Sequence, residues 1–234
     1  TPSELKPFTS EEIFYLKSVY NWQPPSFDLS VNSLPLKENS YVTFGCLNEL
    51  YKINQEVIAQ WAKILHKIPQ SRLLLKAKQF NDPQTQELYL KHFAHHKIAP
   101  ERLLLFGSST HKDHLAHYHD VDITLDPFPY GGGVTALESL WMGVPVISLR
   151  AGSRMRASIL KQAGLTEWVL DTVEAYIEFA QEKAQSETLS LLRSNLREQL
   201  LASPLCNGVE YAHDLENAYR TVWVSWCDKV QNPL

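Results

Sequence analysis

The sequence predicts a mixed α/β fold built around a doubly wound parallel sheet. Short runs of apolar residues recur along the chain, and helical segments of about 10–15 residues separate them. The runs are apolar throughout, without alternation, so such strands must be covered by helices on both faces, as in parallel sheets. The chain has 234 residues, of which 44% are hydrophobic, and a chain of this size can bury such a core.

The regular part of the chain begins at residue 40. Its predicted strands are the runs at 41–47, 72–76, 102–107, 121–126, 144–149 and 167–170. The helices predicted between them are 54–67, 83–96, 111–119, 135–143 and 153–164. The first of these helices is the clearest, because its apolar residues recur at intervals of three and four and Pro69 ends it. Five or six such units predict a Rossmann-like sheet, which binds ligands at the carboxyl ends of its strands.

The two ends of the chain have a different character. Residues 1–36 hold five of the 13 prolines and predict an irregular segment, apart from a short helix from Ser10 to Val19 that two glutamates would start. Residues 171–230 predict helices without strands, ending in a long aromatic-rich helix. We therefore expect an inter-lobe connector at 1–39, a nucleotide-binding lobe at 40–205 and a carboxy-terminal helix at 206–234. Core packing is the expected role of Trp61, Trp141, Trp168, Trp223 and Trp226.

The composition excludes several classes of protein. A net charge of −4 gives no general attraction to nucleic acid or to anionic membranes, and no apolar run approaches the ~20 residues that span a bilayer. Three cysteines are too few and too scattered for a disulfide framework or a zinc module. The first residues lack the basic and apolar parts of a signal peptide. We expect a cytoplasmic protein without nucleic-acid or membrane partners.

A run of three glycines, Gly131 to Gly133, follows the strand that ends at Asp126 and precedes a helix. Glycines let backbone amides approach a phosphate closely, and a helix N-terminus adds a partial positive charge. Thr135 could donate a hydrogen bond to the same phosphate, and Glu138 lies one turn further on. No lysine follows the glycines, so this is not a Walker sequence. The pattern favours a phosphate site over a turn without a ligand.

Other candidates follow other strands. Lys52, after the first strand, could neutralise a diphosphate, although most lysines are solvated surface charges. His111, His114 and His117 are spaced three apart and predict one helix face. An exposed face is favoured over a zinc site, because no acidic or cysteine partner has a suitable spacing. An imidazole beside a nucleobase is a better functional interpretation than either. Arg154 could face a phosphate or a sugar, and helix capping or surface exposure is an equal alternative.

Together these motifs resemble the carboxy-terminal catalytic half of the SPINDLY/O-GlcNAc transferase family, which are inverting glycosyltransferases of the GT-B architecture. The matching stretches run in family order: VTFGCLNELYKIN, WAKILHKIPQSRLLLKA, ERLLLFG, HLAHYHDVDITLDPFPYGGGVTALESLWMGVPVISL, GSRMRASILKQAGL and SPLCNGVEYAHDLENAYRTVW. They extend over residues 40–226. The resemblance implies a nucleotide-sugar-binding lobe, with an amino-terminal lobe and tetratricopeptide repeats upstream in the full-length protein.

The resemblance also implies roles for individual residues. Lys52 matches the family lysine that contacts the diphosphate and stabilises the departing charge, and Thr135 matches a phosphate-contacting threonine. His114 matches the histidine beside the nucleobase, and Glu138 matches an acidic position that binds the ribose hydroxyls. We assign donor binding also to Glu49, His111, His117, Gly132, Gly133, Val134 and Arg154.

The implied reaction is transfer of a sugar from a nucleotide sugar to a protein hydroxyl, with no metal required. UDP-GlcNAc is the first expected donor, and GDP-fucose and UDP-glucose are alternatives. Glu49 stands where the animal enzyme has a glutamine, and a carboxylate beside a phosphate is unfavourable unless Lys52 screens it. Gly133 and Val134 stand where the animal enzyme has a histidine and a threonine. A non-catalytic nucleotide-binding or scaffold module is the alternative function, and the isolated chain is expected to be inactive as a transferase.

Overall fold

The computed structural model describes residues 10–18, 20–150 and 154–231, without the side chains of 154 and 229–231. Its centre is a six-stranded sheet in the order β3-β2-β1-β4-β5-β6, in which every neighbouring pair is parallel. The strands are β1 (Thr43–Cys46), β2 (Arg72–Lys76), β3 (Leu103–Phe106), β4 (Ile123–Leu125), β5 (Val146–Leu149) and β6 (Val169–Leu170). The predicted doubly wound parallel sheet is confirmed.

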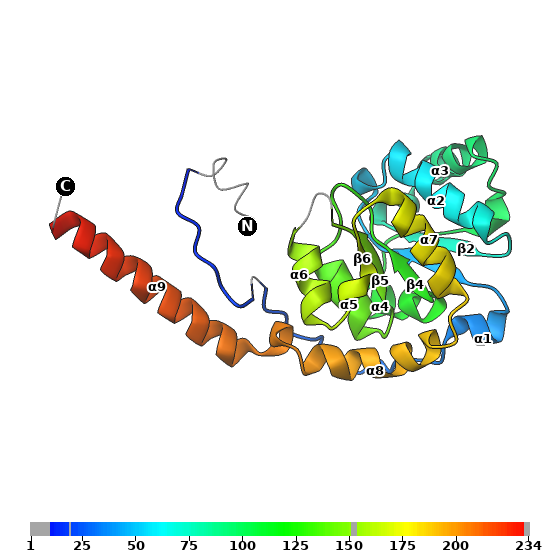
Figure 1. The fold of residues 1–234 in the computed structure, drawn as a ribbon. Coiled ribbons are helices and arrows are strands. Elements are labelled where there is room, and N and C mark those ends of the chain that lie inside the picture. Colours follow the sequence, from blue (N-terminus) through cyan, green and yellow to red (C-terminus); the bar gives the residue numbers. More distant parts are fainter. Residues whose placement is uncertain (1–9, 19, 151–153, 232–234) are drawn as a thin grey trace.

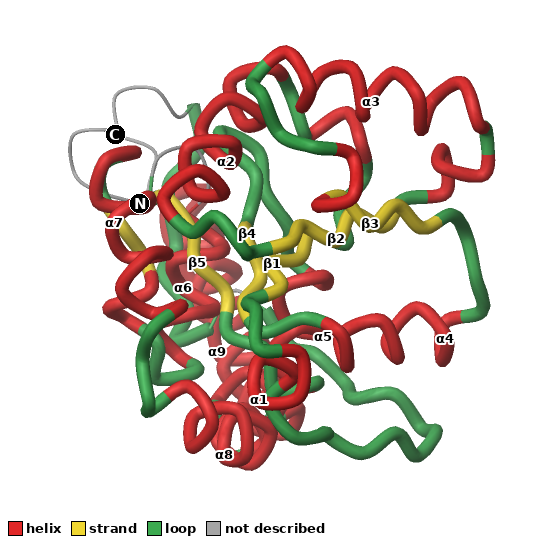
Figure 2. Tube along the Cα trace, turned by 90° about the vertical axis from the view of Figure 1, so that its right-hand side faces the viewer, coloured by secondary structure: helices red, strands yellow, loops and turns green. Residues whose placement is uncertain are grey.

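Helices cover both faces of this sheet (Figures 1 and 2). They are α1 (Pro35–Asn39), α2 (Gln55–Lys67), α3 (Pro83–His95), α4 (His111–Ala116), α5 (Val134–Trp141), α6 (Arg154–Gln162), α7 (Val173–Ala184), α8 (Leu189–Leu201) and α9 (Gly208–Gln231). In Figure 2, α2 and α3 lie above the sheet, and α4, α5 and α8 lie below it. The helix predicted at 111–119 is divided, because its last part is a 3-10 turn from His117 to Asp120.

Side-chain caps start several of these helices. Asn54 accepts a hydrogen bond from the Val57 amide at the start of α2, and Asp82 accepts from the Thr85 amide at the start of α3. Thr110 does the same for α4. Each cap satisfies an amide that has no acceptor inside its own helix, so these boundaries are set locally by the sequence.

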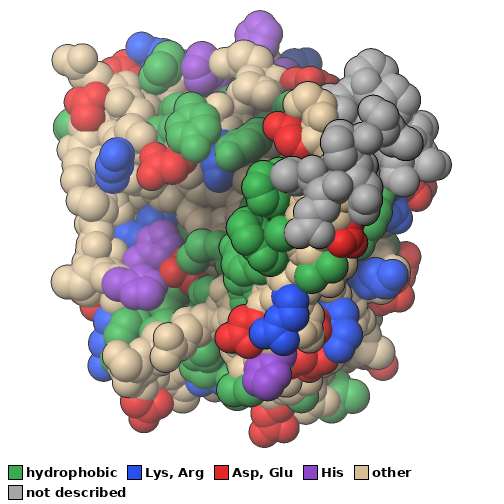
Figure 3. All heavy atoms as spheres, turned by 90° about the vertical axis from the view of Figure 1, so that its left-hand side faces the viewer, with side chains coloured by type: hydrophobic (Ala, Val, Ile, Leu, Met, Phe, Trp, Pro, Cys, Tyr) green, Lys and Arg blue, Asp and Glu red, His purple; other side chains and the backbone are tan. Residues whose placement is uncertain are grey.

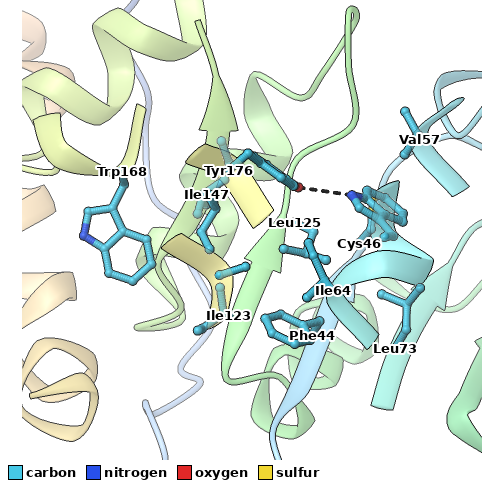
Figure 4. Packing of buried hydrophobic residues seen from close by; sticks show 14 of the residues in the cluster. Phe44, Cys46, Val57, Ile64, Leu73, Ile123, Leu125, Ile147, Trp168 and Tyr176 are labelled. Carbon is cyan, nitrogen blue, oxygen red and sulfur yellow. Dashed lines mark hydrogen bonds between the residues drawn. The ribbon is translucent and has the colours of Figure 1, made fainter. Parts of the chain in front are cut away.

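The main core lies between the sheet and α2 and α7 (Figure 4). Phe44, Ile123 and Leu125 from the central strands are completely buried. Trp61 of α2 is also buried, and its Nε1 donates a hydrogen bond of 3.1 Å to the Tyr176 hydroxyl of α7. This bond satisfies both polar groups inside an apolar core, so the two helices are fixed against each other as well as against the sheet.

The two ends of the chain lie away from the sheet (Figure 1). The helix predicted from Ser10 to Val19 is wrong within the described residues, because residues 10–18 form no helix. An isolated helix of that length is marginal in water, and here Lys17 instead forms ion pairs with Glu210 (3.1 Å) and Asp214 (3.6 Å) of α9. Among the described residues no helix is long and apolar enough to cross a membrane.

The long helix α9 confirms the predicted carboxy-terminal helix but not the packing of its tryptophans. Trp61 and Trp168 are buried and Trp141 packs against the core, as expected. Trp223 and Trp226 are 62% and 54% exposed, and their rings stack on each other at a centroid distance of 5.3 Å. The prediction of core packing is therefore wrong for these two residues, because α9 extends beyond the body of the sheet.

Candidate functional site

The site lies where the strand order reverses, between β1 and β4. The chain leaves β1 towards α2 on one face of the sheet and leaves β4 towards α5 on the other face (Figure 2). The two loops therefore separate at the carboxyl edge and leave a crevice between them, which is where open α/β sheets bind ligands. Lys52 lies in a 3-10 turn after β1, and Thr135 lies in the first turn of α5.

Asn48 joins the two predicted phosphate contacts. Lys52 Nζ donates to Asn48 Oδ1 at 3.2 Å and to the Gly131 carbonyl at 3.2 Å. Thr135 Oγ1 donates to the same Asn48 oxygen at 3.2 Å, and the Tyr118 hydroxyl holds the Thr135 carbonyl at 3.0 Å. Asn48 is itself buried. The structure thus brings together an ammonium and a hydroxyl that the sequence separates by more than 80 positions.

A cavity of about 310 Å³ lies beside these groups. It is lined by Leu47, Asn48, Glu49, Lys52, Lys76, Ala77, Lys78, Gly107, Ser108, Ser109, His114 and Thr135. Lys76 is buried, its Nζ donates to the Gly107 carbonyl at 2.6 Å, and burial lowers its pKa. The lining holds three lysines and one carboxylate, so the cavity suits an anionic ligand. Histidine side chains gather beside a hollow on the face in Figure 3.

Glu138 and the histidines form a second group. His111 Nε2 lies 2.8 Å from Glu138 Oε1, and His114 Nε2 lies 3.9 Å from Glu138 Oε2. Burial raises the pKa of Glu138, and the hydrogen bond from His111 opposes this shift. Burial, with help from Lys76, lowers the pKa of His114 to about 4, so this imidazole is neutral at pH 7. A neutral ring beside the cavity can stack on a base or accept a hydrogen bond from it.

His117 lies at the same edge of the sheet, but the histidines beside the Glu138 carboxylate are His111 and His114. Its ring packs on Phe106 of β3, with the two centroids 4.4 Å apart, and burial lowers its pKa. In the described part of the chain, no group of three or more His, Cys, Asp or Glu residues could hold a metal ion. The histidine spacing that suggested a metal therefore has no metal geometry there.

The glycine run is held tightly by the protein itself. The Gly132 amide donates to Asp126 Oδ1 at 2.9 Å, so this amide already has an acceptor within the protein. The amides that follow it are therefore the ones expected to contact a phosphate. A Cβ on Gly132 would overlap the Thr135 hydroxyl. Gly133 directly precedes α5, and Val134 opens this helix with an exposed side chain. Amides of a first helical turn lack intrahelical acceptors and can bind an anion.

Two residues predicted to bind the donor, Glu49 and Arg154, are not part of the two groups described above. Glu49 is exposed at the cavity rim and accepts a hydrogen bond of 3.0 Å from Gln79 Nε2. Arg154 is the first residue of α6, and its side chain lies outside the described part of the structure. Its neighbour Arg156 is completely buried, with Nε 2.6 Å from Asp126 Oδ2.

Sequence reasoning missed Asn48, Lys76 and the partnership of Arg156 with Asp126. A signal was present for two of them, because Asn48 and Lys76 are polar residues at the carboxyl ends of apolar runs. Such positions lie at the ligand-binding edge of a parallel sheet. Nothing in the local sequence distinguished Arg156 from Arg154.

The sheet order and the crevice at its carboxyl edge define a Rossmann-like α/β fold, which solved glycosyltransferases of the GT-B architecture share. The solved carboxy-terminal domain of a group 1 glycosyl transferase from Francisella tularensis has this fold, with a TM-score of 0.54 and 16% identity over 76% of this chain and 95% of that domain. Residues 30–215 match glycosyl transferase family 41. The chain belongs to this family.

Relatives support the assignment over nearly the whole chain. A Petunia hybrida protein named a probable UDP-N-acetylglucosamine–peptide N-acetylglucosaminyltransferase SPINDLY is 36% identical over 234 residues, covering 97% of this chain. A mutant of the Thermobaculum terrenum O-GlcNAc transferase superposes with a TM-score of 0.88 at 34% identity, covering 98% of this chain and 44% of that one. The chain spans 25% of the length of the Petunia relative.

Proposed function

We propose that this chain is the donor-binding lobe of a nucleotide-sugar-dependent protein O-glycosyltransferase. The observation that carries the proposal is the junction at Asn48, which holds Lys52 and Thr135 together at the rim of a cationic cavity. An ammonium, a hydroxyl and the first amides of α5 then converge where a diphosphate fits. The names of the plant relatives favour UDP-GlcNAc as the donor, with GDP-fucose and UDP-glucose as alternatives.

The proposed reaction is a displacement with inversion at the anomeric carbon. The acceptor hydroxyl oxygen forms a bond to this carbon, the bond from the carbon to the diphosphate oxygen breaks, and a base takes the hydroxyl proton. Lys52, Thr135 and the α5 amides stabilise the charge that develops on the departing diphosphate. Removing one such donor typically costs about 10²–10³ in rate. The reaction as proposed requires no metal, and we assign no general base to this chain.

The nucleoside is proposed to lie along the edge formed by β3 and α4. His114 would contact the base as a neutral imidazole, because burial lowers its pKa to about 4. Glu138 would accept hydrogen bonds from the ribose hydroxyls, and in this arrangement it exchanges its bond with His111 for them. His117, next to Phe106, would complete the apolar side of the base pocket.

The two ends of the chain are proposed to pack against an upstream lobe of a longer protein that also carries tetratricopeptide repeats. The exposed aromatic residues of α9 support this, because exposed apolar patches typically mark interaction sites. The chain also covers only 44% of the Thermobaculum terrenum structure. The isolated chain would then bind nucleotide without transferring sugar to a protein acceptor. The cytoplasmic location expected from the composition stays a prediction.

Titration of the chain with UDP, GDP, UDP-GlcNAc, UDP-glucose and GDP-fucose tests the proposal. The matched nucleotide raises the unfolding temperature in a concentration-dependent way, because it binds only the folded state. We expect the uridine nucleotides to do so, with UDP-GlcNAc stronger than UDP-glucose. A response to the guanosine nucleotides alone would assign the fucose donor. No response to any of them at millimolar concentration would refute a donor-binding lobe.

Glu49 favours a second candidate, a nucleotide-binding module without turnover. Its carboxylate lies on the rim of the cavity, where it repels a diphosphate. The full-length protein decides between the two. Sugar transfer or donor hydrolysis supports the enzyme, whereas nucleotide binding without either supports the module.

A further inference from the structure

A buried ion pair lies directly behind the glycine run. Arg156 of α6 and Asp126 at the end of β4 are 1% and 2% exposed, and Arg156 Nε lies 2.6 Å from Asp126 Oδ2. Removing both charges from water costs several kcal/mol per ion, and only good geometry and further hydrogen bonds recover it. A hydrophobic pair of the same volume would often stabilise the fold as well. The pair therefore calls for an explanation beyond stability.

Among the described residues, the further hydrogen bonds of these two side chains are made to the loop between β4 and α5 or to the neighbouring strand β5. Asp126 Oδ1 accepts from the Gly132 amide at 2.9 Å, and Asp126 Oδ2 accepts from the Ser148 hydroxyl at 2.9 Å. Arg156 donates to the carbonyls of Pro127 (3.2 Å) and Leu149 (3.3 Å). The pair thus holds both sides of the loop, one at its start and one at the glycines.

Gly131 shows how closely the loop is packed on this pair. A Cβ at Gly131 would coincide with Arg156 Nη1 and would also overlap Asp126 Oδ2. The guanidinium therefore occupies the space that a side chain would take. The carbonyl of the same glycine accepts one of the two hydrogen bonds that orient Lys52 Nζ. A continuous set of contacts thus leads from Arg156 through the glycine backbone to the Lys52 ammonium.

We propose that the Asp126–Arg156 pair is a positioning element of the diphosphate site, which sets the backbone of Gly131 and Gly132 and, through the Gly131 carbonyl, the place of Lys52. This rests on the proposed function, because it presumes that Lys52 binds a diphosphate. Arg156 does not touch the ligand. Its planar guanidinium reaches two carbonyls and a carboxylate from three separate nitrogens in a fixed plane, a geometry that the single nitrogen of an ammonium does not reproduce.

The test compares Arg156→Lys with Arg102→Lys in the same chain. Arg102 also uses its guanidinium to hold backbone carbonyls, those of Leu65, Ile68 and Ser71, but it directly precedes β3, at the opposite edge of the sheet. Affinity for UDP and GDP is measured by calorimetry, and the unfolding temperature is measured for each variant. Ser148→Ala is a milder variant, which removes a single hydrogen bond to Asp126 and keeps the charges.

We expect both substitutions of arginine to lower the unfolding temperature, but only Arg156→Lys to weaken nucleotide binding, by about fivefold or more. Ser148→Ala weakens it by about twofold and keeps the fold if Arg156→Lys does not fold. In a Lys52→Ala background the effect of Arg156→Lys falls below about twofold, because the two changes act through one contact.

Two results overturn the inference. One is unchanged affinity in the folded Arg156→Lys and Ser148→Ala variants, which would leave the pair a purely structural role. The other is full additivity with Lys52→Ala. If the wild-type chain binds neither UDP nor GDP, the proposed function fails first and the inference fails with it, so that the two failures are distinguishable.

Discussion

Replacement of Lys52 by alanine tests the chemistry of the site directly. The ammonium donates to two neutral oxygens, those of Asn48 and Gly131, and two tyrosine rings, Tyr51 and Tyr130, lie 5.9 and 5.1 Å from it. These partners orient the charge without neutralising it. A bound diphosphate would therefore meet a positive charge that is already in place.

The expected size of the effect follows from this geometry. A hydrogen bond to a charged group contributes about 1.5–3 kcal/mol, and each 1.4 kcal/mol is about tenfold in affinity. Lys52 is half-buried, so that solvent and salt screen part of the interaction. We therefore expect Lys52→Ala to weaken binding of the matched nucleoside diphosphate by about tenfold at physiological salt, and by more at low salt.

The assay is calorimetry with UDP and GDP at fixed ionic strength. Lys63→Ala is the matched control, because Lys63 is exposed on α2 and its loss changes the net charge by the same amount. The control should leave the affinity unchanged. An affinity of Lys52→Ala within twofold of wild type, in a chain that still unfolds cooperatively, would refute the assignment of Lys52 to the diphosphate.

Two further predictions concern the pH dependence of stability and the glycine run. Burial lowers the pKa of His114 to about 4 in the folded chain, against a usual value of 6.5. The unfolded state then binds more protons between these values, so that stability is lost as the pH falls from 6.5 to 4, by about 2 kcal/mol at pH 5. Urea unfolding at pH 7.5 and pH 5 should show that His114→Gln loses less stability than wild type over this interval; an equal loss would contradict the burial argument. Gly131→Ala should lower the unfolding free energy by about 1–3 kcal/mol or more, because its Cβ overlaps Arg156, whereas Gly133→Ala meets only the flexible end of Met155 at 2.8 Å and should cost less. Thermal unfolding compares the two, and equal costs would contradict the predicted packing.

The exposed tryptophans and the absent first helix show the limits of sequence patterns. Trp223 and Trp226 follow the periodicity of α9 but remain 62% and 54% exposed, because the pattern of a helix does not say what lies opposite it. The segment from Ser10 has a helix-start signal, but local signals alone do not stabilise a helix of this length.

The sequence by itself determined the alternation of strands and helices, the ends of α2 and α3, the start of α4 and the place of the glycine run. These features depend on neighbours within one or two turns, where periodicity and capping residues act. It also placed Lys52 and Thr135 at the same edge of the sheet, since parallel strands bring their carboxyl ends together.

The tertiary structure alone decided which groups those residues meet. The partners of Asn48, of Glu138 and of Asp126 lie up to 87 positions away along the chain. Hydrogen bonds between such distant residues depend on the strand order and on the exact turn of each loop, which no local pattern encodes. For the same physical reason no local pattern shows that Arg156 lies buried behind the glycine run.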